Sequence, residues 1–181
     1  MLIPVWLDEA VVGDGVDLTV GGPFGYALRF YGQTDPYAGS GPVENLLVEG
    51  EEIAVAGAIE GVIGSTSRPP LVVVRCGGLR IIASSARDTG TVSFYGRLDV
   101  EEWCDEIDAP DDLGDITQLG VVRSLQLVEA RKRELLPGYR VPMGEAARYE
   151  ITETRPHYRT KGGVPIYECS LLAHVEFDVG V

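Results

Sequence analysis

The closing segment constrains the fold most, because apolar and polar residues alternate along it for thirteen positions. Successive side chains of a strand point to opposite faces, so strict alternation separates a buried face from a solvated one. The mainly polar parity holds Glu168, Ser170, Leu172, His174, Glu176 and Asp178. The apolar parity holds Tyr167, Cys169, Leu171, Ala173, Val175, Phe177 and Val179. The pattern predicts a long strand with one face in a core.

Residues 91–100 carry the same alternation and predict a second strand of this kind. Its polar parity includes Tyr95, Arg97 and Asp99, and its apolar parity is formed by Val92, Phe94, Leu98 and Val100. Gly96 lies on the apolar parity, where a missing side chain indicates a bulge or the close approach of another backbone.

The stretch between residues 51 and 84 predicts further strands in close succession. Residues 53–63 form a long apolar row that we expect to bend at Gly57 and Gly61. Gly77-Gly78 predicts a hairpin turn between the short runs 71–74 and 79–83. Strands in this order predict an all-β fold, an antiparallel barrel or curved sandwich with short helical turns. The nearest named architecture is the oligonucleotide/oligosaccharide-binding (OB) barrel.

The chain of 181 residues is expected to form a single domain over 1–181. Within it we expect an N-terminal β meander over 1–42 and the main β barrel over 43–181, with a weak boundary near 109–115. One helical turn is expected over 101–107. Residues 121–136 are ambiguous between strand and helix, because Val121, Leu125, Val128 and Leu135 suit one face of a helix. We favour a strand through Val128 and then a short helix, since the second half of this segment is rich in helix-forming residues.

Charge is distributed unevenly. The net charge is −13, which favours solubility and opposes casual binding to nucleic acid or to an anionic membrane. Residues 99–115 hold nine acidic residues and no basic one, whereas residues 120–161 hold nine basic residues and five acidic ones. An acidic loop and a basic segment therefore follow each other in sequence, and the simplest interpretation is that they partly neutralise each other.

The acidic loop leads to the first functional hypothesis, a non-enzymatic binding module that docks to or neutralises a basic protein partner. Clustered charge of one sign speeds the encounter with a partner of opposite charge. The competing interpretation is a solvated loop without a function. The expected contact residues are Asp105, Glu106, Asp108, Asp111, Asp112 and Asp115.

The basic segment 131–161 leads to the alternative hypothesis, single-stranded nucleic-acid binding by an OB-like protein. Cationic side chains interleaved with aromatic rings suit a flexible strand, because the bases stack while the phosphates are neutralised. The residues expected to carry this binding are Arg131, Lys132, Arg133, Tyr139, Arg140, Tyr158 and Arg159.

No catalytic motif supports an enzyme, and no cofactor is expected. The glycine clusters lack the spacing of a dinucleotide fingerprint or a phosphate-binding loop. His174 and Glu176 share a strand face and are weak metal candidates, but zinc needs three or four ligands, so no metal is expected.

Other features concern location and assembly. Three scattered cysteines without a C-x-x-C pair fit a reducing compartment, and there is no secretory signal or long apolar run. A cytoplasmic protein with no membrane contact is therefore expected. Long strands with exposed edges also allow pairing between copies as a homo-oligomer.

Overall fold

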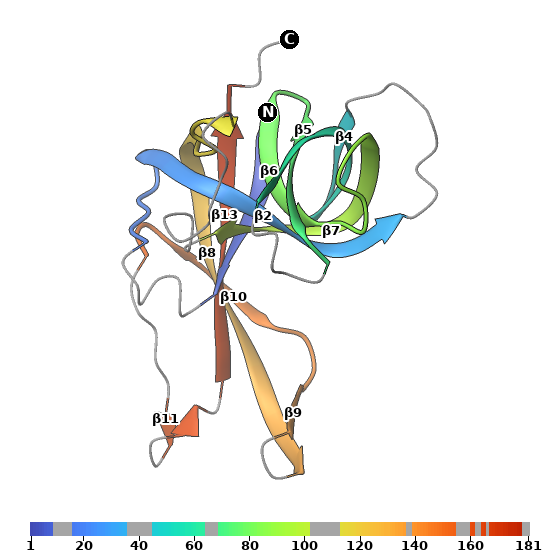
Figure 1. Cartoon of the computed structure of the whole chain (residues 1–181). Coiled ribbons are helices and arrows are strands. Elements are labelled where there is room, and N and C mark those ends of the chain that lie inside the picture. Colours follow the sequence, from blue (N-terminus) through green and yellow to red (C-terminus); the bar gives the residue numbers. More distant parts are fainter. Residues whose placement is uncertain are drawn as a thin grey trace.

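The computed structural model describes residues 1–8, 16–35, 45–63, 69–101, 113–136, 139–154, 160–161, 164–165 and 167–178. These residues are almost entirely β-strand, so the all-β prediction is confirmed (Figure 1). No helix in this part of the chain has the length and apolar character needed to cross a membrane. The strands are β1 (Leu2–Asp8), β2 (Pro23–Asp35), β3 (Asn45–Glu49), β4 (Glu52–Ile63), β5 (Leu71–Cys76), β6 (Leu79–Ser84), β7 (Thr91–Glu101), β8 (Gln118–Leu136), β9 (Tyr139–Pro142), β10 (Ala147–Ile151), β11 (Thr160–Lys161), β12 (Val164–Pro165) and β13 (Tyr167–Phe177).

Most of these strands belong to one mixed sheet. Its strand order is β10-β8-β13-β1-β7-β2-β6-β5-β4-β3, β9 pairs with β8, and β11 and β12 form a separate hairpin. The sheet is mostly antiparallel, but β1 runs parallel to β7 and β2 runs parallel to β6. Two further pairings, β8 with β2 and β7 with β4, close the sheet on itself.

The closing pairings create two rings that share the β2–β7 ladder. The first ring runs β4-β5-β6-β2-β7 and returns to β4. The second runs β2-β7-β1-β13-β8 and returns to β2. In Figure 1 the first ring is the curled group at the upper right, and β8 continues downward from the sheet to its hairpin with β9.

The alternation read from the sequence places the apolar parities in the core, although Leu172 of the mainly polar parity is also completely covered. In β7 the apolar parity is buried, with Leu98 completely covered, and in β13 Val175 and Ala173 are completely covered. A continuous hydrophobic cluster links both rings through Phe24, Leu28 and Phe30 of β2. The rings are therefore two lobes of one core.

Two glycine features behave as expected. Gly77 and Gly78 both have positive φ angles, as the predicted hairpin turn between β5 and β6 requires. Gly96 pairs directly with Gly32 of β2, and a Cβ atom on Gly96 would lie 2.3 Å from the carbonyl oxygen of Tyr31. The close backbone approach predicted at Gly96 is confirmed.

A second apolar cluster lies on the outside of the first ring. Residues 113–118, called here the strap, pack Leu113 and Ile116 onto this outer face. The strands β5 and β6 are consequently buried on both faces, which explains why their sequences are apolar runs without alternation. The covered residues are Ala27, Ile63, Leu71, Val73 and Ile82.

The expected helix after Val128 is wrong. Strand β8 continues to Leu136, and its second half pairs with β9 from Lys132 onward. Ladder hydrogen bonds and a partner strand outweigh the modest helix preference of these residues.

The other local expectations concern residues that are only partly described. The expected turn over 101–107 falls almost entirely outside the described residues, which resume at Leu113. The division at residue 42 remains a prediction, although β1 and β2 lie in the same sheet as the later strands.

Candidate functional site

Both strands of the shared ladder change their second partner partway along, and each change creates a seam. Strand β2 pairs with β8 through Tyr26 and with β6 from Leu28. Strand β7 pairs with β4 through Gly96 and with β1 from Leu98. Where two partner strands leave the same edge of a strand, a gap opens between them. Such a gap is either covered by another segment of the chain or remains open as a groove.

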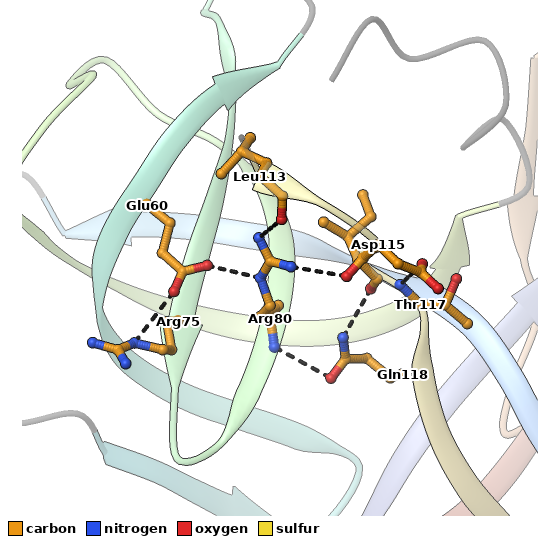
Figure 2. A network of polar contacts seen from close by, with 8 residues as sticks. Glu60, Arg75, Arg80, Leu113, Asp115, Thr117 and Gln118 are labelled. Carbon is orange, nitrogen blue, oxygen red and sulfur yellow. Dashed lines mark hydrogen bonds and ion pairs between the residues drawn. The ribbon is translucent and has the colours of Figure 1, made fainter. Parts of the chain in front are cut away.

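The seam at β2 is filled by the strap. Arg80 of β6 donates hydrogen bonds to the backbone oxygens of Leu113 at 2.5 Å and Asp115 at 2.8 Å, and it forms an ion pair with Glu60 at 2.7 Å. The amide nitrogen of Gln118 donates to Ile116, while its oxygen accepts from the Arg80 backbone. Figure 2 shows Arg80 at the centre of this network, which fixes the strap over the outer face.

Replacing Arg80 with alanine is expected to loosen the strap and to lower the free energy of unfolding by about 1–3 kcal/mol, because two backbone oxygens and Glu60 lose a charged donor. Hydrogen exchange should show faster exchange at residues 113–118. Arg75→Ala is the matched control, since Arg75 shares Glu60 but lies on the side away from the strap (Figure 2). Equal protection of the strap in both variants would contradict the anchoring role.

The seam at β7 stays open and forms a groove of about 450 Å³. Strands β1 and β4 both use the same edge of β7, and the groove lies where one ends and the other begins. We call it the aromatic groove, and its lining consists of Trp6, Tyr31, Gly32, Glu51, Glu52, Tyr95, Gly96 and Arg97.

Two aromatic rings at the groove already hold a guanidinium group. The Cζ atom of Arg97 lies 5.7 Å from the centroid of the Trp6 ring, and Arg97 also donates to Asp99 at 2.9 Å. The Cζ atom of Arg29 lies 5.1 Å from the Tyr31 ring centroid. Cations are attracted to the negative faces of aromatic rings, so this surface is suited to guanidinium groups.

The remaining ring, Tyr95, is bound to a carboxylate. Its hydroxyl donates to Glu52, and this bond, with the charge of Glu52 and Glu49, raises the pKa of Tyr95 above its usual value. The neighbouring Glu51 is held by both terminal nitrogens of Arg148 of β10. The β3–β4 turn therefore presents ordered carboxylates along one wall of the groove.

Asp99 lies behind Arg97 and is 9% exposed. Burial raises its pKa to about 6, although Arg97 opposes this effect. One carboxylate oxygen, Oδ1, has no hydrogen-bond partner among the described residues. Desolvation of an ionised carboxylate that lacks full compensation explains the direction of the shift.

Of the acidic residues predicted to bind a partner, only Asp115 lies in the described part of the chain. Its carboxylate accepts a hydrogen bond from the Thr117 backbone at 2.8 Å, and the bonds from Thr117 lower its pKa. The five other predicted residues, Asp105, Glu106, Asp108, Asp111 and Asp112, lie outside the described residues.

The predicted nucleic-acid residues fall partly on the β8–β9 hairpin, which projects away from the rings (Figure 1). Arg131 is exposed and Lys132 is half-buried on β8. The backbones of Arg133, Tyr139 and Arg140 belong to the same hairpin. These five predicted residues thus belong to one hairpin, and the other two, Tyr158 and Arg159, lie outside the described residues.

The two weak metal candidates have other partners. His174 Nδ1 lies 3.1 Å from the Ser124 hydroxyl, and Arg123 donates to Glu176 at 2.6 Å. In the part of the chain that the structure describes, no three histidine, cysteine or carboxylate side chains gather closely enough to hold a metal ion.

The aromatic groove was not predicted from the sequence. Gly96 gave the one usable signal, since it marks where β7 is approached closely by other backbones. The lining comes from four separate parts of the chain, and no local pattern shows that Trp6 lies beside Arg97. No protein family, curated protein or solved structure compared with this chain matches it.

Proposed function

We propose that this protein is a non-enzymatic binding module that docks onto a basic protein partner through the aromatic groove. The observation that carries this proposal is the groove itself, an open seam with two aromatic rings that are nearly half exposed. Tyr31 is 45% exposed and Tyr95 is 46% exposed. Exposed tyrosine rings beside ordered charges are typical of protein interaction surfaces.

The charge around the groove favours a basic partner. Three guanidinium groups, from Arg29, Arg97 and Arg148, face a larger set of carboxylates. That set consists of Asp8, Glu49, Glu51, Glu52, Asp99 and Glu101, which line the groove or act on its tyrosines and on Asp99. The local excess of negative charge has the same sign as the net charge of −13, so both steer a cationic partner toward this face.

The proposal is tested by capture from an extract of the source cell, using two variants with the same change of charge. Glu49→Gln/Glu52→Gln removes two charges beside the groove, and Asp105→Asn/Asp108→Asn removes two from the acidic loop. We expect the wild type and the Asp105→Asn/Asp108→Asn loop variant to capture a basic protein. The Glu49→Gln/Glu52→Gln groove variant should capture at least about tenfold less of it, because charges at the contact act more strongly than the net charge.

A purified complex must then reproduce this order, with association slowed by salt. Loss of the protein in the loop variant alone would place the contact where the sequence suggested and overturn the role of the groove. Capture of an acidic protein, or of a second copy of this chain, would overturn the proposed partner class. We place the protein in the cytoplasm, where its buried thiols Cys76 and Cys169 stay reduced.

A second candidate function is single-stranded nucleic-acid binding by an OB-like barrel. Its support is the pairing order of the first ring, in which the long strand β4 pairs on both edges and β6 runs parallel to β2. This is the order of a five-stranded OB-type barrel whose last strand comes from the N-terminal side of the chain. The strap covers the outer face of β5 and β6 that such barrels use, so binding would rely on the β8–β9 hairpin.

Under this second candidate, Arg131→Ala/Lys132→Ala should weaken binding of a single-stranded oligonucleotide and reduce its salt dependence by about one to two counterions. Fluorescence anisotropy at low and high salt measures both quantities. Arg123→Ala, which removes a base bound to Glu176 elsewhere on β8, is the control. Binding that is equal in all three proteins would rule out the hairpin as the contact.

A further inference from the structure

Three aromatic residues line the groove, and Tyr95 differs from Trp6 and Tyr31 in what covers its ring. Arg97 covers the Trp6 ring and Arg29 covers the Tyr31 ring. Within the described part of the chain, no guanidinium group is stacked on Tyr95. A ring with 46% exposure and a bound carboxylate therefore stands open beside two rings that each carry a cation.

Among the described residues, the carboxylates next to Tyr95 also form no ion pair. Glu49 and Glu52 pair in register at the ends of β3 and β4. Neither forms an ion pair with a described residue, whereas the adjacent Glu51 is held by Arg148. The Tyr95 position thus offers a ring face and two negative charges, which is the environment that Arg97 finds between Trp6 and Asp99.

We propose that Tyr95, Glu49 and Glu52 form a seat for an arginine side chain of the partner. This inference rests on the proposed function and adds its chemistry. A planar guanidinium group can stack on the phenol ring and at the same time donate two parallel hydrogen bonds to a carboxylate. A lysine ammonium is a compact, strongly hydrated charge that does not stack in this way, so the seat discriminates between the two cations.

The backbone beneath the ring keeps this seat in place. Tyr95 lies next to Gly96, where β7 contacts Gly32 on one edge and Ile53 on the other. Ala54 of β4 pairs with Tyr95, and Glu52 precedes Ala54 by two residues, so ring and carboxylate lie on the same face of this ladder. A positioned site spends less of its interaction energy on ordering side chains.

Octa-arginine and octalysine test the inference, because they carry equal charge and differ only in the cationic group. We expect the wild-type protein to bind octa-arginine about threefold more tightly than octalysine in fluorescence anisotropy at low salt, the effect of one exposed cation–π contact. Tyr95→Leu should abolish the preference and leave octalysine binding unchanged. Tyr95→Phe keeps the ring and should keep the preference.

Tyr149→Leu is the matched control, because Tyr149 of β10 is 48% exposed and does not line the groove. Equal affinity of the wild type for the two peptides, or a preference that survives Tyr95→Leu, overturns the arginine seat. If Glu49→Gln/Glu52→Gln then weakens both peptides equally, the proposed function stands without the seat. If neither peptide binds the wild type, the inference and its parent proposal both fail.

Discussion

Replacing Gly96 with alanine is expected to lower the free energy of unfolding by about 3 kcal/mol, the upper part of the range for overpacking a rigid site. The new Cβ atom would lie 2.3 Å from the carbonyl oxygen of Tyr31 and 2.7 Å from the Cα atom of Gly32. Both are backbone atoms of the ladder that the two rings share, so no flexible side chain can move to make room. Urea denaturation followed by tryptophan fluorescence measures the loss.

The matched control for this substitution is Gly25→Ala, on the neighbouring strand β2. A Cβ atom there would meet only Leu119 at an ordinary contact distance of 3.8 Å. We expect Gly25→Ala to change stability by less than about 1 kcal/mol, or to raise it slightly by restricting the unfolded chain. A mild effect of Gly96→Ala would mean that β2 and β7 separate easily at this point. The inference that the backbone at Gly96 holds the aromatic groove rigidly would then be wrong.

The sequence specified which segments are strands better than it specified their partners. Alternation in residues 91–100 and 167–178 predicted the buried faces of β7 and β13, because burial on one face imposes a period of two. The parallel pairing of β1 with β7 brings together Trp6 and Asp99, and no local pattern records such a long-range choice. Pairing depends on how strands coil in space, which is a property of the whole sheet.

The same limit explains which functional residues were found. The charged stretches were visible because like charges are adjacent in sequence. They led to Asp115 and to Arg131, neither of which lines the groove. Tyr31, Glu52 and Tyr95 are single residues on polar parities of three strands. Each one alone is an ordinary surface residue, and only the seam at Gly96 makes them neighbours.

Replacing Asp99 with asparagine is expected to change how stability depends on pH. In the folded protein the pKa of Asp99 is about 6, above the value of 3.8 for an unperturbed aspartate. The folded state therefore holds this proton more tightly than the unfolded state. The resulting stabilisation is fully present below about pH 4 and is lost as the pH rises through 6. A shift of about two units corresponds to about 3 kcal/mol.

Asparagine cannot ionise. Between pH 4 and pH 7 the free energy of unfolding of the variant should therefore fall by about 2–3 kcal/mol less than that of the wild type. The favourable interaction with Arg97 is already contained in the pKa of about 6, since Arg97 lowers the value that burial raises. Asp115→Asn is the control with the opposite sign, because a lowered pKa makes that carboxylate favour the folded state above its unfolded pKa.

Parallel profiles of stability against pH for the wild type and Asp99→Asn would contradict this prediction, because they would show that the Asp99 carboxylate is hydrated in solution. Arg97 would then have no buried charge to hold it over Trp6, and the guanidinium-bearing wall of the groove would lose its physical basis.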